Sequence, residues 1–253
     1  MKYYKELAQI GLFKIDAAVR ITGDRYKAEK TIASLLKSGE IRRIKRNLYT
    51  VVNPSTLEDF SNRFVIASHI TDSSFVSYHS AFEFYGFYNQ VFYEVQVAST
   101  KKFQPFTYGE YEYLFFETGS LKQVDIIQET KVTTIERTIV DSINMLGKVM
   151  DVEELVKCMD LVHRVDEEKI KEMLLEYNKE ILYRKVGYFL SFYQEDLNIS
   201  DGFFDFCKDH SKRDNVGSIS SNEIKKLEYV SEWGLYAYKD LRMIAAKGGN
   251  IDV

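Results

Sequence analysis

The chain has 253 residues, of which 45% are hydrophobic and only two are proline, a composition that supports packed cores and excludes a disordered protein. No run approaches the roughly 20 apolar residues of a membrane span, and the first residues lack the features of a signal peptide, so we expect a cytoplasmic protein with no membrane partner. Cys158 and Cys207 are isolated from each other, so we expect both to be free thiols. The formal net charge of −4, taken over the whole chain, disfavours nucleic acid.

The charge is, however, unevenly distributed. Residues 1–52 hold 12 of the 34 basic residues and 5 of the 38 acidic residues, a balance of +7. The rest of the chain holds the other 22 basic and 33 acidic residues, a balance of −11. This asymmetry predicts a basic nucleic-acid module joined to an acidic body.

The first residues predict two short helices. Three apolar residues at helical spacing indicate a first helix that stops at Gly11: Tyr3, Leu7 and Ile10. A second helix is expected over residues 15–21, with its turn at Gly23. Asp24 then occupies the position of an N-cap, where its carboxylate would accept hydrogen bonds from the free amides of a third helix.

The third helix has the clearest apolar face in the chain. Its inward residues lie at i, i+4, i+7 and i+8: Ala28, Ile32, Leu35 and Leu36. At about 100° per residue, the opposite face carries Tyr26, Lys27, Lys30, Ser34 and Lys37. Lys27 and Lys30 lie in the first half of the helix, the part that enters the major groove in helix-turn-helix docking. We therefore predict that this helix contacts DNA through Arg25, Tyr26, Lys27, Lys30, Thr31, Ser34 and Lys37.

A basic β-hairpin is expected after Gly39, which should end the third helix. Five apolar residues flank its turn: Ile41, Ile44, Leu48, Tyr49 and Val51. The turn is Lys45-Arg46-Asn47, and asparagine tolerates the left-handed conformation that such turns need. Four cations lie on the hairpin with few carboxylates expected nearby, so DNA phosphates or the minor groove are their predicted partners: Arg42, Arg43, Lys45 and Arg46. This order of elements predicts a winged helix-turn-helix over residues 1–52 that binds double-stranded DNA.

Residues 53–147 predict an α+β domain. The capping box Ser55-x-x-Glu58 should open a helix whose inward residues are Leu57, Phe60, Phe64 and Ala67. The elements expected next are a strand over 73–76, a helix over 78–85, and strands over 92–98, 102–107 and 110–117. A second capping box, Thr133-x-x-Glu136, should open a helix that runs to Leu146. The 16 Phe and Tyr residues from Phe75 to Phe116 are expected to be strand formers and core rather than stacking platforms for single-stranded nucleic acid.

Residues 148–253 predict a mostly helical region. Apolar stripes at helical spacing run over 152–162 and 170–177, and further helices are expected over 184–193 and 201–210, the last capped by Ser200. The segment 217–238 is ambiguous, with Tyr229, Trp233 and Leu235 as one possible strand face. The tail from Ala245 is expected to fray. The predicted fold class is α+β, with residues 53–147 and 148–253 forming one body or two.

Two runs of the middle region, FVSYHSAFEFYGFYNQVFYEVQVAS and KVTTIERTIVDSI, resemble the AbiEi-type antitoxins of bacterial abortive-infection systems. Such proteins have an N-terminal winged helix that ends in a short strand like NLYTV. The matching pieces here are the wing over 42–49, the helix around Ser77, Ser80 and Ala81, and the segment Glu136-Arg137-Thr138…Asp141. The wing of the family usually carries Gly before Leu/Ile-Tyr, whereas this chain has Asn47. The resemblance covers residues 1 to about 195, and its motifs are structural rather than catalytic.

The resemblance implies an antitoxin that binds and represses its own operon promoter, expected at inverted repeats. It also implies a functional partner, a nucleotidyltransferase-like toxin encoded by the adjacent gene. In this type IV scheme the antitoxin counteracts the toxin without forming a stable complex with it, and the acidic body would deliver that activity.

No catalytic residue, cofactor or metal is predicted. The four histidines are scattered, and His79 with Glu83 at i, i+4 is more typical of a hydrogen bond than of a two-ligand metal site. Glu94-Val95-Gln96, after Asp72, is weakly similar to the Asp…Glu-x-Lys site of restriction-endonuclease-like nucleases, but Gln96 replaces the lysine that helps to activate water.

Two other functions are kept as alternatives. The first is a free-standing winged-helix transcriptional regulator with a ligand-sensing body, and the second, more distant, is a nuclease. Five basic residues outside the winged helix are candidates for additional DNA contacts: Lys101, Lys102, Arg137, Lys212 and Arg213.

Overall fold

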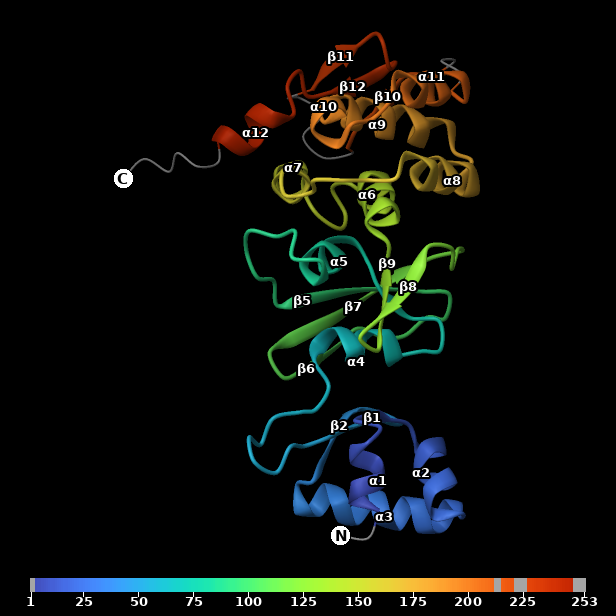
Figure 1. The fold of residues 1–253 in the computed structure, drawn as a ribbon, viewed down its shortest axis with the longest axis vertical. Helices are drawn as coiled ribbons and strands as arrows, with labels where there is room; N and C mark the ends of the chain where they lie inside the picture. Colours follow the sequence, from blue (N-terminus) through green and yellow to red (C-terminus); the bar gives the residue numbers. More distant parts are fainter. Residues whose placement is uncertain (1–2, 212–214, 221–226, 248–253) are drawn as a thin grey trace, which may run out of the picture.

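The computed structural model describes residues 3–211, 215–220 and 227–247. In Figure 1 the molecule is elongated and has three tiers: a small N-terminal unit, a sheet with helices on both sides, and a layer of helices that carries a small sheet of its own. The fold is α+β, as predicted. Within the described residues, no helix has the length and apolar character needed to cross a membrane.

The N-terminal tier consists of short helices packed on a three-stranded sheet. Its elements are α1 (Tyr4–Ala8), β1 (Leu12–Phe13), α2 (Ile15–Thr22), α3 (Arg25–Ser38), β2 (Ile41–Lys45) and β3 (Leu48–Val51). The strands are antiparallel in the order β1-β3-β2. The predicted helices and hairpin are therefore confirmed in position. Ile10 is the exception, because α1 ends before it and its side chain is 40% exposed rather than inward.

The hairpin β2–β3 contributes to two different cores, although Arg42 and Arg43 are exposed. Ile41 and Val51 belong to the hydrophobic cluster of the N-terminal tier. Ile44 and Leu48 belong to the cluster of the middle tier. A bulge between Arg43 and Lys45 shifts the register, so that Lys45 pairs with Leu48 and lies, like Ile44, on the side of the middle tier.

The segment that joins the first two tiers is a loop, so the helix predicted from the Ser55 capping box is wrong. The Oδ1 atom of Asn53 accepts a hydrogen bond from the amide of Ser55 at 2.9 Å, and Val52 pairs with Asp59 in an antiparallel bridge. These bonds fold the chain back on itself and use backbone groups that a helix would need. The helix begins later as α4 (Arg63–His69), with Asn62 as N-cap.

The middle tier is a mixed sheet in the order β6-β7-β5-β4-β9-β8. Its elements in chain order after α4 are β4 (Phe75–Val76), α5 (Tyr78–Phe84), β5 (Glu94–Ser99), β6 (Phe106–Tyr108), β7 (Tyr111–Glu117), β8 (Val124–Ile127) and β9 (Thr130–Thr133). In Figure 1, α4 lies on the side of the N-terminal tier and α5 on the opposite side. Both faces of β5 are consequently buried, with Val95 and Val97 in the middle cluster and Ala98 in the large cluster above.

The hairpin β8–β9 was absent from the sequence prediction. Its turn residues, Gln128 and Glu129, have positive φ angles of 47° and 66°. Turns of this type usually contain Asn or Gly, whose absence removes the local signal. The helix that follows, α6 (Ile135–Asn144), was predicted, but its N-cap is Thr134 rather than Thr133.

The third tier is mostly helical, as expected. It contains α7 (Val152–Met159), α8 (Glu167–Tyr177), α9 (Glu180–Ser191), α10 (Gln194–Leu197), α11 (Asp201–Asp209), β10 (Gly217–Ser218), β11 (Glu228–Val230), β12 (Leu235–Ala237) and α12 (Arg242–Lys247). Ser200 caps α11 as predicted. Tyr229 and Leu235 lie on adjacent strands rather than on one, with Trp233 in the turn between them. Most of the tail predicted to fray, from 248 onward, lies outside the described residues.

One hydrophobic cluster joins the middle and third tiers. Phe75, Phe82 and Ala98 from the sheet layer belong to the same cluster as residues of α6 to α9. Fourteen of the 16 aromatic residues between Phe75 and Phe116 are buried or half-buried; Tyr88 and Tyr93 are exposed. These aromatics therefore form core, as predicted.

Candidate nucleic-acid interface

Local sequence signals determine where α3 begins and ends. The Oδ1 atom of Asp24 accepts a hydrogen bond from the amide of Lys27 at 2.9 Å, which makes Asp24 the predicted N-cap. Gly39 ends the helix with a φ of 75°, a conformation that glycine adopts without steric cost. Between these ends, Ala28, Ile32 and Leu35 are buried in the N-terminal core. These buried residues determine which face of α3 is turned toward the core and which is turned away from it.

The opposite face of α3 is exposed. All five residues that the angular count assigned to this face are exposed: Tyr26, Lys27, Lys30, Ser34 and Lys37. Tyr26 is 64% exposed although it is aromatic, and the ammonium of Lys30 lies 4.5 Å from its ring centroid. Thr31 is half-buried at the edge of the face. In Figure 1, α3 lies at the end of the molecule farthest from the C-terminal helices.

The tip of the hairpin lies close to the start of α3. Lys45 pairs with Leu48, which leaves Arg46 and Asn47 as the loop. Asn47 has a φ of 63°, as predicted, and its Oδ1 atom accepts a hydrogen bond from the amide of Ile15 at 2.9 Å. A hollow of about 340 Å³ at this point is lined by Ile15, Asp16, Arg25, Arg46, Asn47 and Tyr49. The exposed guanidinium groups of Arg25 and Arg46 therefore border one concave surface, where Arg25 also pairs with Glu29 at 3.1 Å.

Arg42 departs from the prediction that the hairpin cations have few carboxylates nearby. Its Nη1 atom lies 3.0 Å from Oδ1 of Asp59, and its Nη2 donates to the carbonyl of Leu57 at 2.8 Å. The hydroxyl of Tyr108 donates to the other oxygen of Asp59 at 2.7 Å. Arg42 thus holds the connecting loop and the middle tier, which reduces its availability to DNA.

Lys45 is also directed to the middle tier. Its ammonium lies 5.0 Å from the ring centroid of Phe103 and 4.7 Å from that of Phe106. Partial burial and the nearby charge of Lys14 lower the pKa of Lys45. Arg43 and Arg46 are exposed, as Arg42 is, and the guanidinium of Arg43 lies 5.6 Å from the ring centroid of Tyr49.

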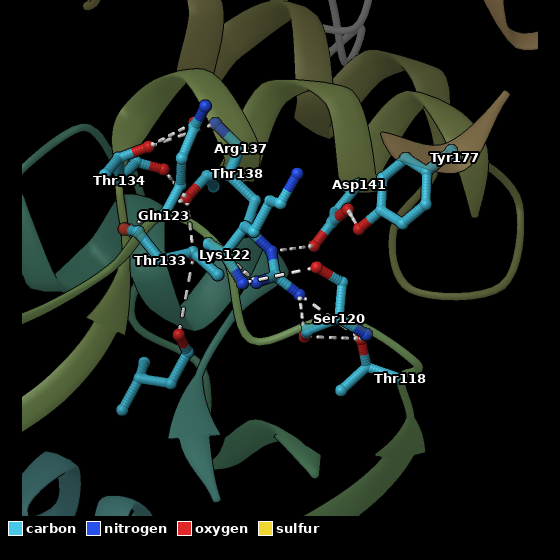
Figure 2. Close-up of polar contacts among 11 residues, drawn as sticks. Thr118, Ser120, Lys122, Gln123, Thr133, Thr134, Arg137, Thr138, Asp141 and Tyr177 are labelled. Carbon is cyan, nitrogen blue, oxygen red and sulfur yellow. Dashed lines mark hydrogen bonds and ion pairs between the residues drawn. The ribbon is translucent and has the colours of Figure 1, made fainter. Parts of the chain in front are cut away.

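Arg137 cannot contact DNA, because its side chain is fully buried. Figure 2 shows its guanidinium enclosed by the loop at Thr118 to Lys122 and by Asp141. Its Nε donates to Asp141 at 3.1 Å and its Nη2 to the carbonyl of Ser120 at 3.0 Å. Tyr177 of α8 donates to the other oxygen of Asp141. This segment, which carries part of the family resemblance, therefore joins α6, α8 and the β7–β8 loop.

The other candidate DNA contacts have different surroundings. Lys101 is exposed and lies 3.3 Å from Asp72, which also binds Lys14 at 2.9 Å. Lys102 is exposed. Lys212 and Arg213 lie outside the described residues.

The residues considered for a nuclease site lie far apart. Glu94 begins β5, whereas Asp72 bonds Lys101, which follows the other end of that strand. Five residue steps along a strand separate the two ends of β5 by about 17 Å. Gln96 is buried between them and bonds the amide of His79 and the carbonyl of Val149. No shared metal site is formed by Asp72 and Glu94.

His79 and Glu83 also have separate partners. Nε2 of His79 lies 3.0 Å from Glu154, and Glu83 pairs with Arg63 at 2.5 Å. Each of the two side chains therefore contacts a residue of another segment. No local pattern in the sequence links His79 with Glu154, because 75 residues separate them.

Comparison with known proteins identifies a similar fold. No family model matches the sequence, and no curated protein matches it. Among solved structures, the RV2827C protein from Mycobacterium tuberculosis matches with a TM-score of 0.67 and 11% sequence identity, over 98% of this chain and 94% of that chain. The two chains share an α+β fold. At this identity the likeness extends to the fold alone.

Proposed function

We propose that the protein is a DNA-binding type IV antitoxin that represses its own toxin–antitoxin operon and counteracts a nucleotidyltransferase-like toxin without a stable complex. In this proposal the N-terminal tier is a winged helix-turn-helix, α3 is its recognition helix and β2–β3 its wing. The exposed face of α3 is the observation that carries the DNA-binding part, because cationic, hydroxyl and aromatic groups lie on it and the large aliphatic residues lie on the other side. The antitoxin part is based on the resemblance to AbiEi-type proteins.

The geometry of the N-terminal tier favours a duplex as ligand. A major groove admits one α-helix, and Lys27 and Lys30 lie on the half of α3 that would enter first. Arg25 and Arg46 border the hollow beside that end of the helix, where they would hold backbone phosphates. Arg42 and Lys45 contribute indirectly, since they hold the hairpin on the middle tier.

The DNA contacts are tested by the salt dependence of binding to the promoter upstream of the gene. The variant Arg43→Ala/Arg46→Ala should lower affinity for all sequences and reduce the slope of log K against log salt by about 1.8, since each neutralised phosphate contributes about 0.9. Lys30→Ala should also alter sequence preference. Lys148→Ala, which removes an exposed lysine from the third tier, is the control and should leave the slope unchanged. An unchanged slope in the double variant would contradict the wing assignment.

The antitoxin role is tested separately from DNA binding. The gene adjacent to this one should encode a nucleotidyltransferase-like protein that stops growth when it is expressed alone. Co-expression of the antitoxin should restore growth, and the Arg43→Ala/Arg46→Ala variant should also restore it if the body delivers this activity. Affinity purification of either protein should not retain the other. Growth arrest that persists with wild-type antitoxin would refute the proposal.

A ligand-sensing regulator is the second candidate, and one observation favours it. A hollow of about 590 Å³ lies between the connecting loop and the β6–β7 hairpin, and its lining includes Asp59, Arg63, Tyr108 and Tyr111. Asp59 also binds Arg42 of the hairpin, so a small molecule here would act close to the wing. If the protein has this role, the adjacent gene should not encode a toxin, and a metabolite should change the affinity of the protein for its promoter.

A further inference from the structure

Three side chains that commonly bind metals meet inside the body, remote from α3. His79 lies in α5, and Glu154 and Cys158 lie one turn apart in α7. All three are buried, and one ligand atom from each lies within 4.8 Å of the other two. The two helices therefore direct a nitrogen, an oxygen and a sulfur atom to the same point.

The distances suit a tetrahedral ion. Nε2 of His79 lies 3.0 Å from Oε1 of Glu154, and Sγ of Cys158 lies 3.7 Å from the same oxygen. With Zn–N and Zn–O bonds of about 2.0 Å and a Zn–S bond of about 2.3 Å, tetrahedral angles put N and O about 3.3 Å apart and O and S about 3.5 Å apart. Small side-chain rotations therefore suffice to bring all three atoms to one ion.

The charge of the cluster suits a divalent cation. Zn²⁺ bound by a carboxylate, a thiolate and a neutral imidazole is electrically neutral, which avoids burial of a net charge. Binding of the ion would release the thiol proton of Cys158 to solvent, because the thiolate is the form that binds a metal. Glu83, one turn after His79, pairs with Arg63 at 2.5 Å and is not one of the three cluster residues.

We propose that His79, Glu154 and Cys158 form a Zn²⁺-binding site. Zinc is the ion whose ligand preference best matches this set of nitrogen, oxygen and sulfur donors. Three protein ligands leave the fourth position for water on the side of Gln90, whose amide donates to Oε2 of Glu154 at 2.9 Å. The ion would fasten α5 of the middle tier to α7 of the third tier. This site is independent of the proposed DNA-binding and antitoxin functions.

The site is tested by titrating the EDTA-treated full-length protein with Co²⁺, a spectroscopic substitute for Zn²⁺. We expect one Co²⁺ per chain, with the visible bands of tetrahedral cobalt and a near-ultraviolet thiolate-to-cobalt charge-transfer band, both displaced by Zn²⁺. Cys158→Ser should abolish the charge-transfer band, and His79→Gln should weaken Co²⁺ binding by about tenfold or more. Cys207→Ser, which alters the other buried cysteine, is the matched control and should retain the full spectrum.

Folding is measured alongside binding. Far-ultraviolet circular dichroism and the fluorescence of Trp233 should be the same for each metal-free variant and the wild type. If Cys158→Ser is unfolded, Glu154→Gln replaces it, with the expected result that Zn²⁺ raises the thermal midpoint of the wild type and not that of the variant. The proposal is overturned if wild-type protein gives no charge-transfer band or if Cys158→Ser gives the same band.

Discussion

The buried guanidinium of Arg137 gives the sharpest stability prediction. It donates to four acceptors: the carboxylate of Asp141, the carbonyls of Lys122 and Ser120, and the hydroxyl of Thr118. The guanidinium also lies 4.8 Å from the ring of Phe75. Arg137→Met should fill much of the same volume but leave the carboxylate of Asp141 buried without its cation.

The magnitude follows from what the substitution leaves behind. Loss of one partner from a buried ion pair costs about 3–5 kcal/mol, and each carbonyl left without a donor adds about 1 kcal/mol or more. With two carbonyls affected, we therefore expect Arg137→Met to lower the free energy of unfolding by about 5–7 kcal/mol, a large fraction of the roughly 5–15 kcal/mol that stabilises a typical domain. Arg137→Met/Asp141→Leu should be less destabilised than the single variant, because no uncompensated charge remains.

The measurement is urea unfolding followed by the fluorescence of Trp233, the single tryptophan, which is buried in the same cluster as Phe75. Arg164→Met removes an exposed arginine and should change the free energy by less than about 0.5 kcal/mol. A cost below about 1 kcal/mol for Arg137→Met would refute the reasoning from buried charge. So would a double variant whose cost equals or exceeds the sum of the two single costs.

Two further predictions concern the contacts of the N-terminal tier. Asn47→Gly can keep the φ of 63° but loses the hydrogen bond to the amide of Ile15, which should lower the free energy of unfolding by about 1 kcal/mol. Asn47→Val loses the same bond and adds about 1–2 kcal/mol of backbone strain. Equal thermal midpoints for the two variants would contradict this order. Hydrogen bonds from Lys14 and Lys101 lower the pKa of Asp72 below its ordinary 3.8, so its stabilising contribution is present above that pH and is lost as the pH falls through the lowered pKa. Carbon-13 NMR of the Asp72 carboxyl should therefore show a midpoint below 3.8, and a midpoint at or above 3.8 would disprove the effect.

Elements with strong local signals were predictable from sequence. Asp24 and Gly39 bound α3 because an N-cap carboxylate and a C-terminal glycine act on their own immediate backbone. The angular count identified the exposed face of α3 for the same reason, since a helix of fixed pitch needs only its apolar side to be known. The capping-box motif was less specific: near Ser55 the side chain of Asn53 and a β-bridge took the backbone groups instead.

Contacts between distant segments were not predictable. The hairpin cations looked equivalent in sequence, yet Arg42 binds Asp59 and Lys45 lies on Phe103 and Phe106. These partners depend on how the hairpin packs on the middle tier, which no local pattern encodes. The contact between His79 and Glu154 of α7 was unpredictable for the same reason, because it forms only where the third tier packs on the middle tier.

The packing of the hairpin β2–β3 on two cores has a practical consequence for any attempt to isolate the N-terminal tier. A fragment ending at residue 52 would retain the N-terminal core but would expose Ile44 and Leu48, which pack on the middle tier in the intact chain. Such a fragment is expected to aggregate or to bind hydrophobic surfaces unless both residues are replaced by polar ones. A fragment ending at residue 52 that carries Ile44→Thr/Leu48→Thr is therefore expected to be more soluble than the same fragment without these changes.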